Sequence, residues 1–289
     1  QGTIAAYNGP KGGNLTVKDI DIGYNRASAD NGPYNAIQID RFFRGFTLLN
    51  SVLHDSDMCL LTGGGNGEVV LKNDVFSHCG SADAGSGAGF NHNVYLSWYF
   101  AAADTDKVTI EGGRSVDVTN EGDPLKLRVA SGSISNFTVG CTGAYDDCEP
   151  NWPVDIPCGG KYVLSHMVIE RGPKASNAGM VRYGEEQGIP KNCPASGRTY
   201  SLLLDHVTLI DDGPSDGRHA NFAVCAGRDI GPRCINSGYR LVVRNSVIIS
   251  NPQAAATGLG DGVSDGGGNK FYASRGAAGL QPYPYLPAP

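Results

Sequence analysis

The sequence predicts an all-β chain that folds as a single right-handed parallel β-helix. Three observations predict it: a short strand pattern that recurs along nearly the whole chain, a turn-rich composition, and the lack of any long segment with helical periodicity. The 41 glycines and 16 prolines against 3 methionines favour strands and turns over helices. An antiparallel sandwich would favour regular two-residue hairpin turns, which the sequence lacks. We expect one β-helix domain with loop insertions over 1–257, then an extended Gly- and Pro-rich tail over 258–289, packed on the helix.

Each copy of the repeat is a short β-branched run, an Asn or Asp, and a second short apolar run. Successive copies start about 23 to 40 residues apart, which is one coil of a parallel solenoid, the longer intervals holding loops. The copies cover 15–22, 46–53, 69–76, 108–116, 133–139, 162–169, 201–209 and 241–248. A bend between the two runs explains the Asx residue, whose side chain bonds local backbone. We therefore expect a structural ladder of Asn50, Asn73, Asn136, Asp205 and Asn245.

Composition narrows the partners. The net charge of −6 leaves no basic stripe, so we do not expect nucleic acid as a partner. The longest apolar runs are well short of the roughly 20 residues that a membrane helix needs, so no membrane partner is expected. Because a uniformly acidic surface repels polyanions, an acidic polysaccharide would need a local basic site.

The eight cysteines indicate the compartment. They fall as neighbours in sequence, and this local scheme is one of 105 pairings: Cys59–Cys79, Cys141–Cys148, Cys158–Cys193 and Cys225–Cys234. No CxxC pair or zinc-like Cys/His spacing is present, so no metal site is predicted from them. Disulfides form in oxidising compartments. The chain starts at Gln1, as a mature protein does after signal removal and as a truncated chain also would. We expect a secreted or periplasmic protein.

A second set of strands precedes the repeat copies, at 93–97, 124–128, 153–156 and 180–183. Strand alternation places one set of side chains inside: Val94, Leu96, Leu125, Leu127, Val154, Ile156 and Val181. It places Tyr95, Lys126, Asp155 and Arg182 outside, at steps of 31, 29 and 27 residues, one coil each. We expect these four to stack on one face at about 4.8 Å per coil. Arg128 then stands on the same face as Lys126.

This column fits β-elimination from a uronate. Removing the proton next to a uronate carboxylate needs a base, a positive group that neutralises the carboxylate, and an acid for the leaving oxygen. Lys126 or Tyr95 could serve as the base, and Arg182 or Arg128 as the neutralising group. Tyr95 or His92 could supply the acid. These five residues are the candidate catalytic groups.

Neighbouring residues complete the candidate site. The segment 89–95 puts an aromatic residue, a His and two Asn ahead of a strand, which fits a sugar-binding face. We expect contacts to the substrate from Asn91, Asn93, Asp155, Tyr183 and Glu185.

Asp155 has alternative roles. It could hold Lys126 in place, or bind Ca²⁺ with Glu121 or Asp123, which makes Ca²⁺ the one cofactor that the pattern allows. Asp155 with Glu185 could instead form the carboxylate pair of a glycoside hydrolase. A non-catalytic alternative is that the column is an alternating charge ladder that stabilises a solvent-exposed face.

Four segments carry a resemblance to known proteins: Asn91-His-Asn-Val-Tyr95, Asp123-Pro-Leu-Lys-Leu-Arg128, Val154-Asp-Ile-Pro-Cys-Gly-Gly160, and Glu170-Arg-Gly-Pro173 through Tyr183-Gly-Glu-Glu186. With the coil pattern they resemble the pectin-lyase-like right-handed β-helix superfamily, and more narrowly a bacterial group of right-handed parallel β-helix repeat proteins. The resemblance covers roughly 35–250 and implies the fold, because that group has no single agreed reaction.

Chondroitinase-B-like and alginate-lyase-like enzymes of this superfamily use a Lys and an Arg on the helix face. Lys126 best matches that Lys and Arg182 is a looser match, but the residues around Lys126 depart from their motif. The paired-Asp and Gly-His-Gly signatures of polygalacturonase-like hydrolases are absent, as is the Arg-x-x-Pro-x-x-Arg motif of pectate lyases.

Three functions therefore follow from the sequence. The first is a carbohydrate-active protein, namely a polysaccharide lyase (or related C5-epimerase) that acts on an acidic, uronate-containing polysaccharide. The second is a glycoside hydrolase. The third is a structural, adhesive or glycan-binding β-helix that catalyses nothing and could self-associate. The fold alone does not choose among them, since β-helices support all three.

Overall fold

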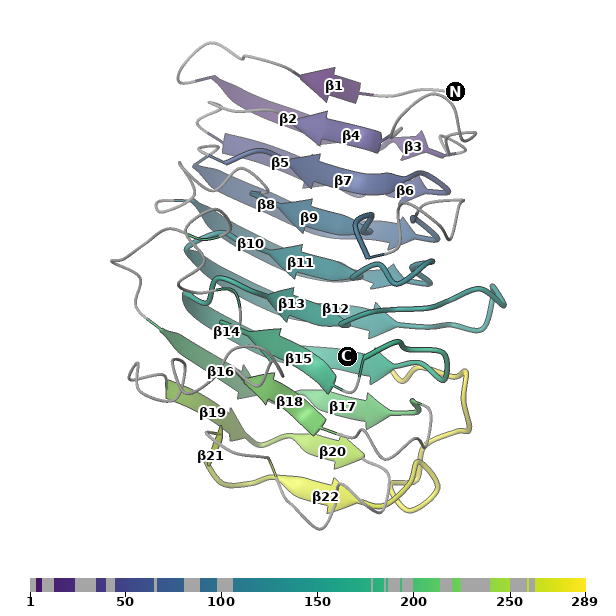
Figure 1. Cartoon of the computed structure of the whole chain (residues 1–289). Helices are drawn as coiled ribbons and strands as arrows, with labels where there is room; N and C mark the ends of the chain where they lie inside the picture. Colours follow the sequence, from purple (N-terminus) through teal and green to yellow (C-terminus); the bar gives the residue numbers. More distant parts are fainter. Residues whose placement is uncertain are drawn as a thin grey trace.

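The computed structural model describes residues 4–6, 13–23, 35–39, 45–64, 67–80, 89–97, 106–177, 179–184, 186, 193, 200–213, 220–224, 240–249, 259 and 263–289. Within these ranges the regular structure is entirely β, in strands β1 to β22 (Figure 1). The strand pairs of both sheets are parallel and in register from one coil to the next, so the all-β expectation is confirmed.

The first sheet carries the short strands and faces the viewer in Figure 1. Its order is β1 (Ile4–Ala6), β4 (Asn35–Ile39), β7 (Met58–Thr62), β9 (Val94–Leu96), β11 (Leu125–Leu127), β13 (Val154–Ile156), β15 (Gly179–Tyr183) and β18 (Ala220–Val224). The sequence pattern located β9, β11, β13 and β15. It missed β1, β4, β7 and β18.

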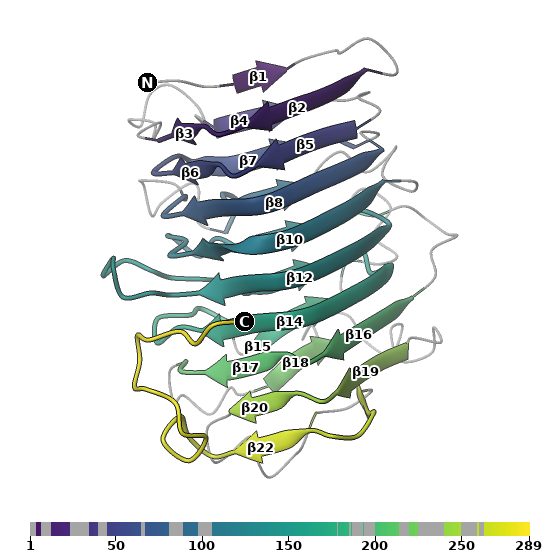
Figure 2. The ribbon, with the colours of Figure 1, turned by 180° about the vertical axis from the view of Figure 1, so that it is seen from behind.

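The second sheet faces the viewer in Figure 2. Its main order is β2 (Asn14–Lys18), β5 (Gly45–Leu49), β8 (Glu68–Ser77), β10 (Lys107–Val116), β12 (Ser131–Gly140), β14 (Lys161–Arg171), β16 (Ser201–Asp205), β19 (Arg240–Arg244) and β21 (Val263–Asp265). Shorter strands continue some coils past the corner: β3 (Asp21–Ile22), β6 (Val52–His54), β17 (Thr208–Asp211), β20 (Val247–Ile249) and β22 (Lys270–Tyr272). Every copy of the predicted repeat coincides with one of these strands or strand pairs.

The chain alternates between the two sheets and advances by one strand in each at every return, which is the order expected of a parallel solenoid. Apolar side chains from both sheets fill the space between them. One inward row runs through Leu60, Val94, Leu125, Val154 and Val181, all with no exposed surface. Because each coil adds the same kind of residue to the row, the core is continuous along the stack.

A column of left-handed residues forms the corner where each long strand of the second sheet bends. It runs through Asp19, Asn50, Asn73, Gly112, Asn136, His166, His206 and Asn245, whose φ angles lie between 48° and 70°. Asn tolerates this conformation better than most residues, which explains the Asx in the repeat. The Nδ2 atoms of neighbouring corner residues donate along the column, from Asn73 to Asn50 at 3.3 Å and from Asn50 to Asp19 at 3.2 Å.

Asp205 was wrongly expected to be a member of this column. The corner of its coil is His206, whose ring stacks on that of His166 at 5.0 Å between centroids. Asp205 precedes the corner by one residue, and its Oδ1 accepts a hydrogen bond from Nδ2 of Asn245 at 3.0 Å. The sequence pattern counted only Asn and Asp as corner residues and so overlooked His166 and His206, although His is also enriched in the left-handed region.

Disulfides join three of the predicted cysteine pairs: Cys59–Cys79, Cys141–Cys148 and Cys158–Cys193. The fourth predicted pair, Cys225–Cys234, lies outside the described residues. The three disulfides are consistent with an extracellular or other non-cytosolic location. In the described part of the chain, no helix is long and apolar enough to span a membrane.

The C-terminal segment 258–289 contributes two strands to the second sheet, since β21 pairs with β19 and β22 pairs with β20. After Tyr272 the chain turns back along the stack, and Figure 2 shows the C-terminus at the level of β14. Arg275 anchors this return through Nε and Nη2 to the carboxylate of Asp212, at 2.8 and 2.5 Å. Pro284 packs so closely on Gly143 that a methyl group at Gly143 would overlap it.

Candidate active site

The outward-facing column on the first sheet is the centre of the candidate site. Lys126 pairs with Tyr95 on one side and Asp155 on the other, and Asp155 pairs with Arg182. Side chains alternate along each strand, so these four point away from the core while their neighbours point into it. The column also extends toward the N-terminal end, because Leu61 pairs with Tyr95 and Gln38 pairs with Leu61. The sequence pattern missed this extension.

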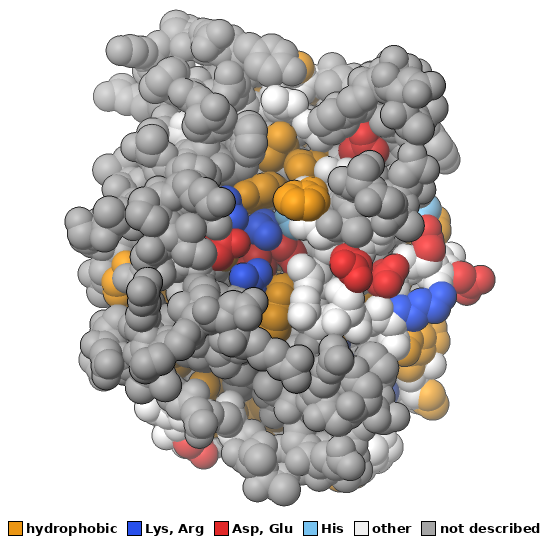
Figure 3. Space-filling model, in the orientation of Figure 1, with side chains coloured by type: hydrophobic (Ala, Val, Ile, Leu, Met, Phe, Trp, Pro, Cys, Tyr) orange, Lys and Arg blue, Asp and Glu red, His pale blue; other side chains and the backbone are white. Residues whose placement is uncertain are grey.

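The column lies in a cleft of about 770 Å³ rather than on an open face. Figure 3 shows acidic and basic side chains gathered in a hollow near the middle of this face, with hydrophobic side chains along its upper part. Tyr95 and Lys126 are 8% and 7% exposed, and Asp155 has no exposed surface. The alternating charge ladder of the non-catalytic alternative is present, since Asp155 lies 3.0 Å from Lys126 and 3.6 Å from Arg182, but Lys126 and Asp155 are buried rather than on a solvent-exposed face.

Lys126 bridges two buried carboxylates. Its Nζ lies 3.0 Å from Oδ2 of Asp123 and 3.0 Å from Oδ2 of Asp155. Burial lowers the pKa of Lys126, but the two carboxylates outweigh burial and raise this pKa above its ordinary value. Lys126 therefore remains an ammonium group at neutral pH. In this arrangement it can neutralise charge, but it cannot accept a proton as a base.

The two carboxylates are fixed by other contacts as well. Oδ1 of Asp123 accepts the backbone N–H of Trp152 at 2.9 Å, and Oδ2 of Asp155 lies 3.6 Å from Nη1 of Arg182. Both aspartates are fully buried, so Asp155 lies beneath the cationic side chains and is not placed to contact a substrate. A Ca²⁺ ion between them would have to displace the ammonium of Lys126.

Tyr95 is the phenol of the cleft. Its ring lies beneath two cations, with Nζ of Lys126 5.6 Å and Cζ of Arg128 5.4 Å from the ring centroid. Burial raises the pKa of Tyr95 above its ordinary value of 10.0, although the charges of Arg128 and Lys126 act in the opposite direction. Tyr95 is therefore mostly protonated at neutral pH, and the two cations would stabilise its phenolate when it forms.

His92 is a neutral hydrogen-bond donor in this site. Its Nδ1 accepts the backbone N–H of Asp123 at 2.8 Å, so the single ring proton lies on Nε2. Burial, and then the charge of Lys126, lower the pKa of His92 well below its ordinary value. The His92 ring meets that of Tyr95 edge-on, with 5.0 Å between centroids. It lines the cleft and can donate to a bound hydroxyl or carboxylate.

An ion pair and a cation–π contact hold the two arginines of the cleft. Nη2 of Arg128 lies 2.6 Å from Oε2 of Glu186, and the guanidinium of Arg182 lies 5.8 Å from the ring centroid of Trp152. The sequence did not assign Glu186 to Arg128, because the two are 58 residues apart and no local pattern links them. Glu186 also lies near the sulfur atoms of Cys158 and Cys193, but these form a disulfide and offer no thiolate ligand.

Of the predicted substrate-binding residues, some line the cleft and others are buried inside the coil. Asn91 lines the cleft, whereas Asn93 is fully buried and donates from Nδ2 to the carbonyl of Val116 at 2.8 Å. Tyr183 is also inside the coil, with its hydroxyl donating to the carbonyl of Gly160. Asn93 and Tyr183 are therefore structural residues. Strand alternation turns Tyr183 inward together with Val181, whereas Asn93 lies just before β9 and is buried through hydrogen bonds to Ser115 and Val116 of the next coil. Glu185 lies outside the described residues.

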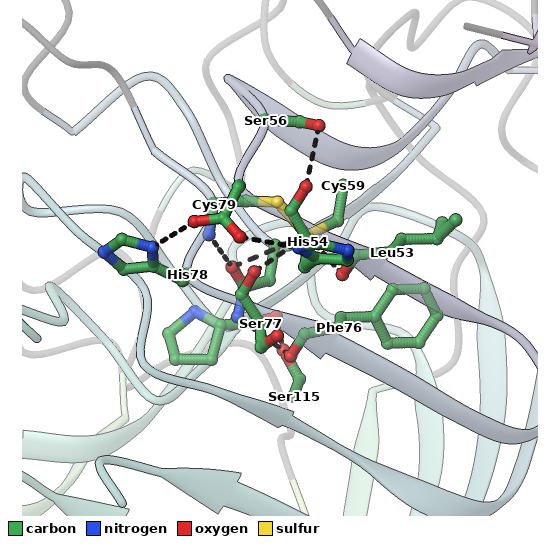
Figure 4. The surroundings of a disulfide bond; sticks show 12 residues. Leu53, His54, Ser56, Cys59, Phe76, Ser77, His78, Cys79 and Ser115 are labelled. Carbon is green, nitrogen blue, oxygen red and sulfur yellow. Dashed lines mark hydrogen bonds and ion pairs between the residues drawn. A yellow bond between two sulfur atoms is a disulfide. The ribbon is translucent and has the colours of Figure 1, made fainter. Parts of the chain in front are cut away.

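Another polar cluster belongs to the second sheet. Figure 4 shows His54 and His78 beside the Cys59–Cys79 disulfide. Their Nδ1 atoms lie 2.6 and 2.5 Å from the two oxygens of Asp55. Burial raises the pKa of Asp55, but the hydrogen bonds from both rings outweigh it and lower the pKa below its ordinary value. This cluster stabilises the corner after β6 and β8 and takes no part in the cleft.

In comparisons with protein-family profiles, curated proteins and solved structures, the chain matches none of them.

Proposed function

We propose that the chain is a secreted or periplasmic carbohydrate-active protein that binds an acidic, uronate-containing polysaccharide in this cleft and cleaves it by β-elimination. One observation carries the proposal: the cations of Lys126, Arg128 and Arg182 line the same cleft as the phenol of Tyr95, and Tyr95 and Lys126 are nearly fully buried there. Cations stabilise a uronate carboxylate as charge develops next to it, and they do so most strongly where water is excluded.

Tyr95 is the proposed proton carrier. Its phenolate would take the C5 proton, the C4–C5 double bond would form, and the bond between C4 and the glycosidic oxygen would break. The phenol would then return its proton to the departing oxygen, which restores the phenolate. Lys126 and Arg128 would stabilise the phenolate, and Arg182 would neutralise the substrate carboxylate. His92 would orient the sugar through its Nε2–H.

A second candidate is glycan binding without catalysis. The specific observation in its favour is that no group of the described cleft is a strong base at neutral pH, since Lys126 is an ammonium, Tyr95 is mostly protonated and His92 accepts a backbone N–H at Nδ1. We do not propose the glycoside hydrolase, because Asp155 is fully buried beneath Lys126.

The test is an ultraviolet assay for the unsaturated uronate product, with a panel of uronate polymers. We expect activity that increases with pH, about tenfold per pH unit below the pKa of Tyr95, because the phenolate fraction increases in that way. Tyr95→Phe should abolish it. Tyr285→Phe is the matched control, since this tyrosine is 56% exposed and lies outside the cleft.

Activity that survives in Tyr95→Phe would contradict the proposed mechanism. Binding of a polymer without any product at pH 7 to 10 would favour the binding protein instead. Release of new reducing ends without the absorbance would indicate hydrolysis.

We also propose that the coils form one right-handed β-helix of the pectin-lyase-like kind. Two parallel sheets visited in turn by every coil support this, because connections between parallel strands of one sheet are right-handed in roughly 98% of cases. A crystal structure would test the hand directly.

A further inference from the structure

The cleft has two chemically different halves. The outward column crosses it in the order Gln38, Leu61, Tyr95, Lys126, Asp155 and Arg182, one residue per coil. At about 4.8 Å per coil, each step is comparable to the length of one sugar ring, so neighbouring sugars of a bound chain would lie on different coils. Tyr95 separates the two halves.

The N-terminal half consists of amide and apolar side chains. Gln38 Oε1 accepts a hydrogen bond from Asn35 Nδ2 at 2.8 Å, and Met58 and Leu61 line the same wall. Phe90 also lines the cleft, and 73% of its surface is exposed, so its ring is available to a ligand. Such a surface suits an uncharged sugar, whose CH face packs on apolar groups while amides bond its hydroxyl or acetamido groups.

The C-terminal half consists of ionic side chains. Lys126, Arg128 and Arg182 lie there, and Glu186 is held by Arg128 at 2.6 Å. A carboxylate bound in this half meets cations. A carboxylate bound against Met58 and Leu61 would lose hydration. The described lining residues of that half include no cation, so the lost hydration would not be replaced by an ion pair and binding there would be unfavourable.

We infer that the preferred substrate is a heteropolymer in which a uronate alternates with an uncharged sugar, rather than a polymer that carries a carboxylate on every residue. This inference depends on the proposed function, because it assigns the uronate to the cationic half and its uncharged neighbour to the amide and apolar half.

The experiment measures the Kd of the full chain for two hexasaccharides by isothermal titration calorimetry. One hexasaccharide alternates a uronate with an N-acetylated uncharged sugar, and the other consists of uronates only. We expect the alternating chain to bind at least tenfold more tightly. The variant Gln38→Lys adds a cation to the uncharged half and should narrow this ratio, whereas Ser264→Lys adds the same charge at an exposed site on β21 and should not.

Equal or tighter binding of the all-uronate chain by the unmodified protein would overturn the inference but leave the proposed acidic substrate intact. An unchanged ratio in folded Gln38→Lys would overturn the assignment of the two halves. Failure of both chains to bind would contradict the proposed function itself. If Gln38→Lys does not fold, the ratio measured on the unmodified protein still decides.

Discussion

Replacement of Lys126 by Met tests whether this side chain is a fixed charge of the site. The substitution keeps an unbranched side chain of similar length but removes the ammonium that lies 3.0 Å from each of two fully buried carboxylates. Asp123 and Asp155 would then be buried without a neutralising partner in that position. Removing one partner of a buried ion pair costs about 3–5 kcal/mol, and this ammonium serves two carboxylates, so we expect a loss at or above the lower end of that range.

The assay is urea unfolding followed by circular dichroism, with Lys72→Met as the matched control. Lys72 also forms an ion pair, with Nζ 2.8 Å from Glu111, but both side chains are about half exposed. Exposed pairs contribute about 0–1 kcal/mol, so the control should lose little. The double variant Lys126→Met with Asp155→Asn should recover part of the loss, because it removes one of the two uncompensated charges.

The pH dependence provides a second check. The pKa of Lys126 is raised in the folded state, so its contribution is fully present below its ordinary pKa of 10.5 and is lost only as the pH increases beyond the folded value. In the unmodified protein, Lys126 should therefore contribute equally to the free energy of unfolding at pH 5 and pH 8. Lys126→Met should be less destabilised at pH 5, where a buried carboxyl group takes up a proton more readily. A loss no larger than that of Lys72→Met at both pH values would refute the reasoning.

Two further predictions concern the scaffold. Gly112→Ala should destabilise the protein by about 1–2 kcal/mol, because Gly112 has a φ of +70° and the new methyl group would lie 2.5 Å from Oδ1 of Asn73. Gly276→Ala is the control in the same urea assay and should be nearly neutral, because the new methyl group would have only one neighbour, at 4.0 Å. Glu170→Gln should remove a pH-dependent part of the free energy of unfolding. Burial, together with the nearby Asp212 carboxylate, raises the pKa of Glu170 well above 4.5, so the folded state retains a proton that the unfolded state releases. The unmodified protein should therefore lose stability as the pH increases above 4.5. A thermal midpoint of Glu170→Gln that depends on pH as steeply as that of the unmodified protein between pH 5 and 8 would contradict this assignment.

The sequence by itself determined the repeat strands of the second sheet and four strands of the first, β9, β11, β13 and β15, with their outward column. Alternation within a strand and a coil period of about 30 residues are local properties, so Tyr95, Lys126, Asp155 and Arg182 could be aligned without coordinates. Three of the local cysteine pairs were also predicted correctly, although the sequence alone offered them only as one of 105 pairings. Alternation along the strand would also have placed Tyr183 inside, since Val181 points inward, but it would not have placed Asn93 there, because Asn93 is buried by hydrogen bonds to the next coil.

Only the tertiary structure decided what the column can do. The sequence contains Asp123, Lys126 and Asp155, but not the fact that all three are buried with the ammonium between the carboxylates. Burial depends on which distant segments cover a strand, as the contact of Glu186 with Arg128 shows. Because burial and charge pairing set whether a lysine is a base or a fixed cation, the proton chemistry of this cleft follows from non-local packing and could not be read from spacing.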